Sequence, residues 1–265
     1  MSYPVFLGAV VVVTGSNDVI RWIENATTFS ATLAAGTYFL RGDGVADDLC
    51  LAIKTAIESG ASANTYSVTV ARSLTPSASN TLITITRLTG ADTFGLVSTA
   101  STFDLALIGF TASTANNATA KTSTRACAAS WASNDAYQRL KPFSSTPAVV
   151  SKVASGRVSG VTRGSRQQSW RVALGFVHES RCNVVDGLTT AADTLEGFIE
   201  RFGAGALVEM HETTNTGAVV DAVTASTLKA RCHFSEESIN EWDPQQIGDA
   251  VPLYDVALVM HSEAV

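Results

Sequence analysis

The chain has 265 residues, 46% of them hydrophobic and 16% charged, with a formal net charge of −6. This composition predicts a globular protein with room for one large domain or two ordinary ones, and a surface rich in small uncharged side chains. Residues 156–265 carry 8 Lys and Arg against 15 Asp and Glu, which disfavours specific nucleic-acid binding because contact with phosphates needs clustered cations.

The N-terminal segment from Val5 to Thr14 is rich in valine and almost continuously apolar. It predicts a strand that is buried on both faces or inserted at a subunit contact. The apolar run is far shorter than the roughly 20 residues of a membrane span, and the chain starts without the basic residues of a signal peptide. We therefore expect no membrane partner and no export. The next apolar group, Asp18 to Asn25, fits either a strand or a helical turn.

The stretch from Phe29 to Gly60 has the clearest pattern. Alternation over Phe29 to Leu33, a turn signal, and a second β-favouring run from Thr37 to Leu40 predict a hairpin. The apolar period then becomes helical and predicts a helix over residues 45–59, which Gly60 ends. The nearby carboxylates lack the spacing of a calcium loop, so they are interpreted as turn and helix-cap residues: Asp43, Asp47 and Asp48.

Further β patterns follow in the same half. Tyr66 to Val70 and Leu82 to Thr86 are expected to pair as antiparallel neighbours. Thr93 to Val97 and Leu105 to Phe110 are also predicted strands, and Gly109 is expected to mark a bend or a close backbone approach. Together these elements predict an N-terminal β domain over residues 1–125.

Residues 126–155 show no sustained period and are interpreted as a connector. The segment is too aromatic for a free linker, so Trp131 and Tyr137 are expected to dock on a domain of the same chain or on a neighbouring chain. An intrachain anchor is the simpler interpretation of both residues.

Residues 156–265 predict a second β domain. Ser169 to Val177 alternates as a half-buried strand does, and a helix is predicted over residues 190–202. Three further strands are predicted at Ala206 to Glu212, Thr227 to Phe234 and Leu253 to His261. Trp242 lies in an acidic loop and is an expected interface residue. The fold class is therefore mainly β (α+β), with two antiparallel β-sandwich-like domains and one flanking helix in each.

The sequence offers no convincing catalytic or metal-binding pattern. Glu209 and His211 share one strand face and could join a mixed metal site, but ordinary strand surface is the favoured interpretation. Phosphate-binding, nucleophile-elbow and zinc-protease motifs do not occur. We therefore expect no cofactor, no metal and no enzymatic activity. Free thiols are the default for the four widely spaced cysteines, although disulfides stay open: Cys50, Cys127, Cys182 and Cys232.

The order of these elements resembles pieces of tailed-bacteriophage virion proteins. The first half is similar to a small β domain of such proteins in Leu33-x-x-Gly36-x-Tyr38, the helix from Asp48 to Ile57, Leu82-x-x-x-x-Arg87 and Leu107-Ile108-Gly109-Phe110. The second half resembles tail-tube-like domains in the Trp170 strand, Leu195-x-x-Phe198-Ile199, Gly205, the strands to Glu209 and Phe234, and the strand from Tyr254 to Leu258. The N-terminal part would be an accessory β domain.

This resemblance implies a structural subunit that self-assembles in a phage tail tube, tail tip or baseplate ring through β-edge and loop contacts. Its partners would be copies of itself in a ring or stack and other tail, baseplate or head proteins. It would be localised to the virion after assembly in the host cytoplasm. Two alternatives remain open, a capsid decoration or neck protein and a receptor-binding or fibre attachment module. Expected interface residues are Trp131, Tyr137 and Trp242.

Overall fold

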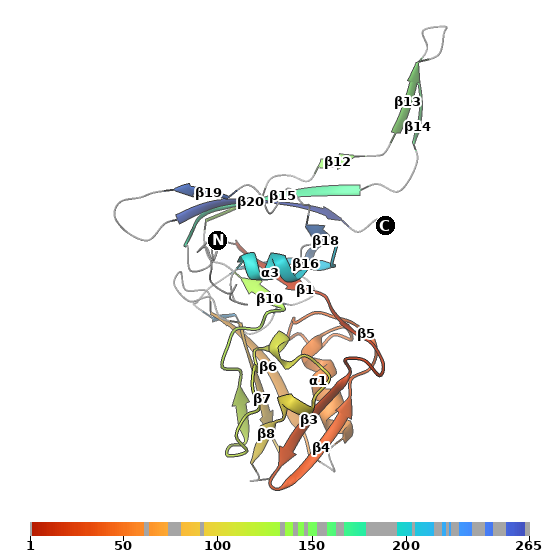
Figure 1. Cartoon of the computed structure of the whole chain (residues 1–265). Helices are drawn as coiled ribbons and strands as arrows, with labels where there is room; N and C mark the ends of the chain where they lie inside the picture. Colours follow the sequence, from red (N-terminus) through yellow and green to blue (C-terminus); the bar gives the residue numbers. More distant parts are fainter. Residues whose placement is uncertain are drawn as a thin grey trace.

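The computed structural model is mainly β, with several antiparallel sheets and two α-helices among the residues it describes (Figure 1). This confirms the fold class predicted from the sequence. No helix in the described part of the chain is long and apolar enough to cross a membrane. The described residues are 2–60, 64–73, 81–90, 93–132, 136–139, 143–145, 148–152, 158–162, 167–178, 195–202, 205–214, 219–220, 223, 228–234, 242–245 and 253–262.

The N-terminal unit, defined here as residues 10–125, holds three small sheets around helix α1 (Leu49–Gly60). One sheet pairs β2 (Val10–Val12) with β5 (Gly36–Tyr38). Another has the order β4-β3-β8, with bounds Thr27–Thr32, Val19–Glu24 and Phe94–Leu96. The third has the order β17-β6-β7-β9, with bounds Val219–Val220, Tyr66–Ser73, Thr81–Arg87 and Ala120–Thr122. The predicted pairing of β6 with β7 is confirmed.

Helix α1 packs one apolar face into the core of this unit. Leu49, Ile53 and Ile57 are fully buried there. The helix starts later than the predicted residue 45 because the side chain of Asp48 accepts the backbone N–H of Cys50 at 3.1 Å, as an N-cap does. Its predicted stop is confirmed, since the helix ends at Gly60.

The predicted hairpin from Phe29 to Leu40 is wrong. Strand β4 pairs with β3 and β5 pairs with β2, so the two halves of the expected hairpin lie in different sheets. The partner of β4 is the group that the sequence left unassigned. A two-residue connection joins β3 to β4 at Asn25, whose φ of 52° is left-handed, a conformation that asparagine adopts more readily than most residues.

The segment Leu105 to Phe110 was predicted as a strand, and this is also wrong. Leu105–Ile108 forms the short 3-10 helix η2, capped by Asp104, whose carboxylate accepts the N–H of Ala106 at 3.0 Å. A second 3-10 turn, η1, spans Ser98–Ala100. Gly109 ends η2 with a φ of 82°, and a Cβ there would lie 2.1 Å from the carbonyl oxygen of Arg125. The close backbone approach predicted at Gly109 is thus confirmed.

Replacing Gly109 with alanine is expected to lower the free energy of unfolding by on the order of 2–4 kcal/mol, because backbone strain and a backbone clash coincide. Gly44 is the matched control: its φ of +73° is similar, but nothing lies within 4 Å of an added Cβ. Gly44→Ala should therefore cost only the strain, about 1–2 kcal/mol. Chemical denaturation of both variants measures the difference, and equal losses would contradict the clash.

The largest sheet has nine strands and carries helix α3 (Leu195–Phe202) on one face (Figure 1). Its main order is β10-β1-β16-β18-β20-β15-β11, while β12 pairs with β15 and β19 with β20. In that order the bounds are Ser130–Ala132, Ser2–Gly8, Val208–Thr214, Leu228–Phe234, Leu253–Ser262, Gln167–His178 and Ala136–Arg139, with β12 at Phe143–Ser145 and β19 at Trp242–Gln245. The predicted helix over 190–202 is thus observed from Leu195, and residues 190–194 lie outside the described ones.

The predicted domain limits 1–125, 126–155 and 156–265 cut across the strand pairing. Strand β1, at the start of the chain, pairs along its whole length with β16 of the C-terminal half. The predicted connector supplies β10, β11 and β12 to the same sheet. In the opposite direction, β17 of the C-terminal half pairs with β6 in the N-terminal unit. Each part of the molecule therefore contains a strand from the other.

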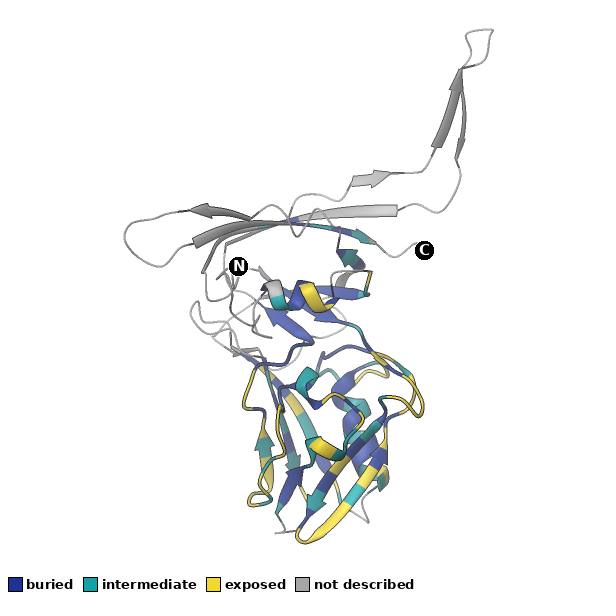
Figure 2. Ribbon diagram, in the orientation of Figure 1, coloured by how far each residue is buried: buried dark blue, intermediate teal, exposed yellow. Residues whose placement is uncertain are grey.

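The two faces of β1 explain its continuous apolar pattern. Phe6 faces α3 and packs against Phe198 and Phe234, with ring centroids 6.5 and 5.8 Å away. Val5 and Leu7 point to the other face, into a small cluster with Phe39 and Val223. All three β1 residues are fully buried. Figure 2 shows the strands next to α3 coloured mainly as buried. The predicted burial on both faces is confirmed for β1 only. The rest of the segment from Val5 to Thr14 contains β2, which belongs to another sheet, and Val11 and Val13 are exposed, so the prediction of one fully buried strand is wrong there.

Strands β13 (Ala148–Lys152) and β14 (Val158–Thr162) form a separate two-stranded ribbon. They pair only with each other among the described strands. Figure 1 shows this ribbon extending away from the large sheet. An isolated two-stranded ribbon is only marginally stable in water.

Candidate functional site

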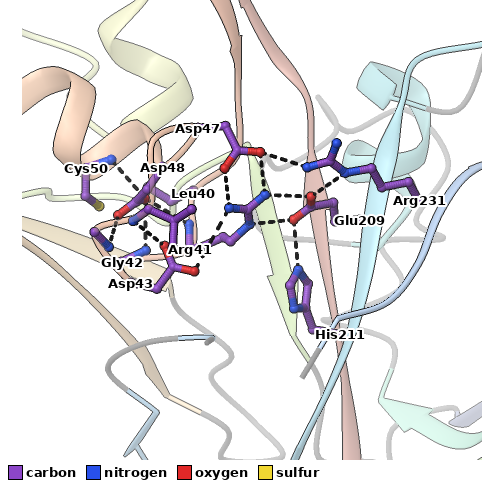
Figure 3. Close-up of polar contacts among 12 residues, drawn as sticks. Leu40, Arg41, Gly42, Asp43, Asp47, Asp48, Cys50, Glu209, His211 and Arg231 are labelled. Carbon is purple, nitrogen blue, oxygen red and sulfur yellow. Dashed lines mark hydrogen bonds and ion pairs between the residues drawn. The ribbon is translucent and has the colours of Figure 1, made fainter. Parts of the chain in front are cut away.

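A cluster of buried and partly exposed polar side chains joins the N-terminal unit to the large sheet. We call it the ionic cluster, and it consists of Arg41, Asp47, Glu209, His211 and Arg231 (Figure 3). The first two members follow β5, in the loop that leads into α1. The other three lie on β16 and β18, where Glu209 and Arg231 are direct cross-strand partners. Residues that are far apart in the sequence thus meet where the N-terminal unit contacts the large sheet. We call this contact the joint.

The loop between β5 and α1 is shaped by one aspartate. The carboxylate of Asp48 accepts backbone N–H groups from Arg41 at 3.2 Å, Gly42 at 3.0 Å and Gly44 at 3.0 Å, besides that of Cys50. Gly42 and Gly44 adopt φ values of 77° and 73°, which residues other than glycine rarely adopt. The Asp48 carboxylate therefore folds the loop back on itself and fixes where the Arg41 side chain starts.

Within the cluster, two arginines alternate with two carboxylates. The guanidinium of Arg41 donates to Glu209 twice, each at 2.7 Å, and to Asp47 at 2.5 and 2.7 Å. Arg231 donates to Glu209 at 2.9 Å and to Asp47 at 2.8 Å. The Nε2 atom of His211 lies 2.9 Å from Oε2 of Glu209. Paired bonds of this kind between a guanidinium and a carboxylate are the strongest type of ion pair in proteins.

Phe39 fills the space between the two arginines. The guanidinium carbons of Arg41 and Arg231 lie 5.4 and 5.3 Å from the centre of its ring. Glu209 and His211 are fully buried, whereas the side chains of Asp47 and Arg231 are 32% and 41% exposed. The cluster therefore has a dry inner end and a wetter outer rim.

The charges in the cluster hold each other ionised. Burial alone would raise the pKa of Glu209, but hydrogen bonds from Arg41 and His211 outweigh it and lower this pKa to about 2. The hydrogen bonds to Glu209 raise the pKa of Arg41 against the opposing effect of burial. The hydrogen bond from Arg41 lowers the pKa of Asp47. Proton transfer at neutral pH is thus disfavoured at each of these groups.

Glu209 should make the fold sensitive to acid. Its pKa is about 2 in the folded chain against a reference value of 4.5, so its contribution is present above about pH 4.5 and is lost as the pH falls toward 2. The difference corresponds to on the order of 3 kcal/mol. Unfolding free energies measured from pH 6 to pH 2 should fall less steeply in Glu209→Gln than in the parent chain. Parallel curves would contradict the assignment.

A fully buried arginine lies on the N-terminal side of the joint. Arg72 of β6 donates to the carbonyl oxygens of Leu40 and Arg41, and its Nε lies 3.4 Å from the Ser130 hydroxyl of β10. Burial lowers its pKa to about 10, so it stays charged at neutral pH. Its guanidinium therefore ties together the loop that carries Arg41 and the outer strand of the large sheet.

A second buried carboxylate, Glu24, lies inside the N-terminal unit. It accepts from the Trp22 indole at 2.8 Å, from the Asn64 amide at 2.6 Å and from the Tyr66 hydroxyl. Arg87 lies 3.9 Å away. Burial and the hydrogen bond to Glu24 raise the pKa of Tyr66. This network of buried polar side chains is a structural feature of the core.

The ionic cluster is built to hold two parts of the chain together. Both oxygens of Glu209 are engaged by cationic or imidazole nitrogens, which leaves little capacity for a substrate or a metal ion. Within the described residues, no group of three or more His, Cys, Asp or Glu side chains is placed to bind a metal. The arrangement supports positional rigidity, and nothing in its geometry supplies an activated nucleophile.

The structure places the predicted interface residues differently from one another. Trp131 lies on β10, is 1% exposed and stacks on Phe6 at 5.8 Å, so it occupies the position of an intrachain anchor. Tyr137 and Trp242 lie on β11 and β19, and their side chains are outside the described residues. Cys50, Cys127 and Cys232 are buried free thiols, whereas Cys182 lies outside the described residues.

Two members of the cluster were misassigned from the sequence. Glu209 and His211 were interpreted as ordinary strand surface, and this is wrong because both are fully buried. The ion pairs of the cluster that involve Arg41, Asp47 and Arg231 were not predicted from the sequence. The sequence does indicate that Glu209 and His211 share a face, because they alternate with Val208 and Met210 along the strand. It does not indicate what covers that face. Asp48 was correctly interpreted as a helix cap, whereas Asp47 pairs with arginines.

Comparisons with protein-family models, with curated proteins and with solved structures find no match to this chain.

Proposed function

We propose that the protein is a self-assembling structural subunit of a bacteriophage tail, in the tube, the tip or a baseplate ring. The observation that carries this proposal is the β13–β14 ribbon, which pairs with no other described strand and extends from the large sheet (Figure 1). Because such a ribbon is marginally stable alone, a neighbouring subunit would supply the surface that fixes it. The resemblance to tail-tube-like domains agrees with this interpretation.

The ionic cluster supports the same proposal. A subunit in a ring or stack transmits position from one contact to the next, so its parts must keep a fixed relative orientation. Exchange of β1 and β17, together with the buried Arg41–Glu209 pair, gives this chain such a joint. The partners are then copies of this chain and adjoining tail or baseplate proteins, and the location is the virion. Catalysis is no part of the proposal.

Sedimentation and light scattering of the purified chain over a wide concentration range test this function. We expect concentration-dependent oligomers, and rings or stacks by electron microscopy. Gold labelling of intact virions should place the chain in the tail. Label on the head would favour a decoration or neck protein instead, and glycan binding by the isolated chain would favour a receptor-binding module. A sharply monomeric chain that also fails to assemble with tail proteins would overturn the proposal.

A further inference from the structure

Strand β4 is an open edge of the sheet β4-β3-β8. It pairs with β3 alone among the described strands. The N–H of Leu33 donates to the carbonyl oxygen of Asp18 at 2.7 Å, which shows that Thr32 directs its own N–H and C=O groups away from β3. In the same register Thr28 and Ser30 do so too. Within the described part of the chain, no hydrogen bond engages these outward backbone groups.

The other edges of the three sheets around α1 are shorter, and several are covered or charged. Among the described strands, β4 has six residues, whereas β2, β5, β8, β9 and β17 have two or three. The side chain of Asn17 covers β2, since it accepts the N–H of Val13 at 2.7 Å and donates to the carbonyl oxygen of Val11 at 2.8 Å. On β8, Leu96 exchanges hydrogen bonds with Thr114 at 2.8 and 2.9 Å. Strand β9 has a lysine at its centre, and such a charge discourages edge pairing.

Strand β4 has none of these protections. No charged residue and no proline occurs in residues 25–40, a run that contains the whole strand. Thr28, Ser30 and Thr32 are exposed, and Figure 2 shows most of the strand coloured as exposed. Gly60, at the end of α1, has no side chain to cover the Ser30 carbonyl oxygen, whereas an added Cβ would lie 2.8 Å from it. An uncharged edge of this length is a template for pairing with another strand.

We propose that β4 of one copy pairs antiparallel with β4 of a second copy. The outward groups are spaced evenly about Ser30, so a two-fold axis places Ser30 opposite Ser30 and Thr28 opposite Thr32. At each opposed position the two residues exchange two backbone hydrogen bonds. Hydroxyl side chains then face hydroxyl side chains across the contact, which is a favourable cross-strand combination. The strand is thus complementary to itself, and this makes a second copy its partner.

The position of β4 allows a second copy to approach. Figure 1 shows β4 at the end of the N-terminal unit that is remote from the large sheet. Arg21 of β3 is exposed and is the direct partner of Ser30. In the pair of copies the two Arg21 residues are three strand spacings apart, about 14 Å, which exceeds the screening length of about 8 Å at physiological salt. The contact rests on the proposed function for its role, and because it closes after two copies, growth into a ring or stack uses a further surface.

Ser30→Glu tests the contact without weakening the single chain. Glutamate at this position lies across from Arg21, so the variant should unfold at the same temperature as the parent or a higher one. In the pair of copies two glutamates lie directly opposite each other, so self-association measured by sedimentation should weaken at least about tenfold. Thr69→Glu is the matched control, because it adds the same charge to an exposed position on β6 in another sheet. The control should associate as the parent does.

Disulfide crosslinking tests the register of the pair. Opposed hydrogen-bonded residues have Cα atoms about 5.5 Å apart, a separation that suits a disulfide. The variants are made with Cys182→Ser, since Cys50, Cys127 and Cys232 are buried. Ser30→Cys should then crosslink to a second copy of itself. Thr28→Cys should crosslink with Thr32→Cys but not with itself, which distinguishes this register from random collision and from parallel pairing.

The possible failures separate the two proposals. If the parent chain assembles and Ser30→Glu assembles equally well, or if Ser30→Cys crosslinks no faster than Thr28→Cys, the β4 contact is wrong and the assembly function stands. If crosslinks form in the expected register but gold label is absent from the virion tail, the function is wrong and the contact stands. A parent chain that stays monomeric at every concentration would overturn both proposals.

Discussion

Fragments 1–125 and 126–265 are expected to be unfolded or insoluble when they are expressed separately. The C-terminal fragment loses β1, whose Val5, Phe6 and Leu7 are fully buried in the large sheet. Burial of three such side chains is worth roughly 5–9 kcal/mol, which is comparable to the whole net stability of a domain. The N-terminal fragment loses β17 and the contact of the Val223 N–H with the Arg41 carbonyl, 3.0 Å long. Circular dichroism and thermal unfolding of each fragment measure the effect.

Co-expression of the two fragments should restore a folded complex that purifies as one species. A protease site engineered within residues 153–157 provides the matched control, because a cut there removes no described strand. The nicked chain should keep the unfolding transition of the intact one. A cooperative transition in either isolated fragment would show that the predicted limits at residue 125 define independent domains after all.

Arg41→Met is expected to lower the free energy of unfolding by about 3–5 kcal/mol, because it leaves the fully buried Glu209 without its principal partner. Methionine keeps the apolar stem of the side chain, so the loss mainly reports the guanidinium group, with its charge and hydrogen bonds. Removing the carboxylate as well, in Arg41→Met with Glu209→Met, should recover part of that loss, since no unpaired charge stays buried. Urea denaturation of the single and double variants gives the coupling energy.

Arg231→Met is the matched control for this experiment. Arg231 contacts the same two carboxylates, but its side chain is 41% exposed. Its removal should therefore cost about 1 kcal/mol, as for an ion pair at the surface. If Arg41→Met cost no more than Arg231→Met, the joint between the two parts of the chain would not depend on the buried pair.

Local pattern predicted much of the secondary structure, and strand partners were harder to predict. The helix ending at Gly60 and the neighbours β6 and β7 were found because their apolar periods are long and their partners are close in sequence. The hairpin from Phe29 to Leu40 failed because a plausible turn signal at Gly36 competed with the turn at Asn25. Both positions fit the residue preferences of a tight turn. The observed pairing of β3 with β4 is the one that includes the fully buried Ile20 and Trp22.

The candidate site depended on information that no short window contains. Arg41 and Glu209 are 168 residues apart in the chain, and long-range strand pairings, such as that of β1 with β16, bring the N-terminal unit next to the large sheet. A polar face on a strand normally indicates solvent, so Glu209 and His211 were assigned to the surface.

The position of β1 has a consequence for synthesis of the chain. Val5 pairs with His211, so β1 must wait after its synthesis for a partner made about 200 residues later. At about 5–20 residues per second this delay lasts on the order of 10–40 s. During that time an uncharged, valine-rich segment is exposed without its sheet, which is the type of sequence that aggregates most readily. Slower synthesis would lengthen this exposure, and a chaperone that binds apolar segments would protect it.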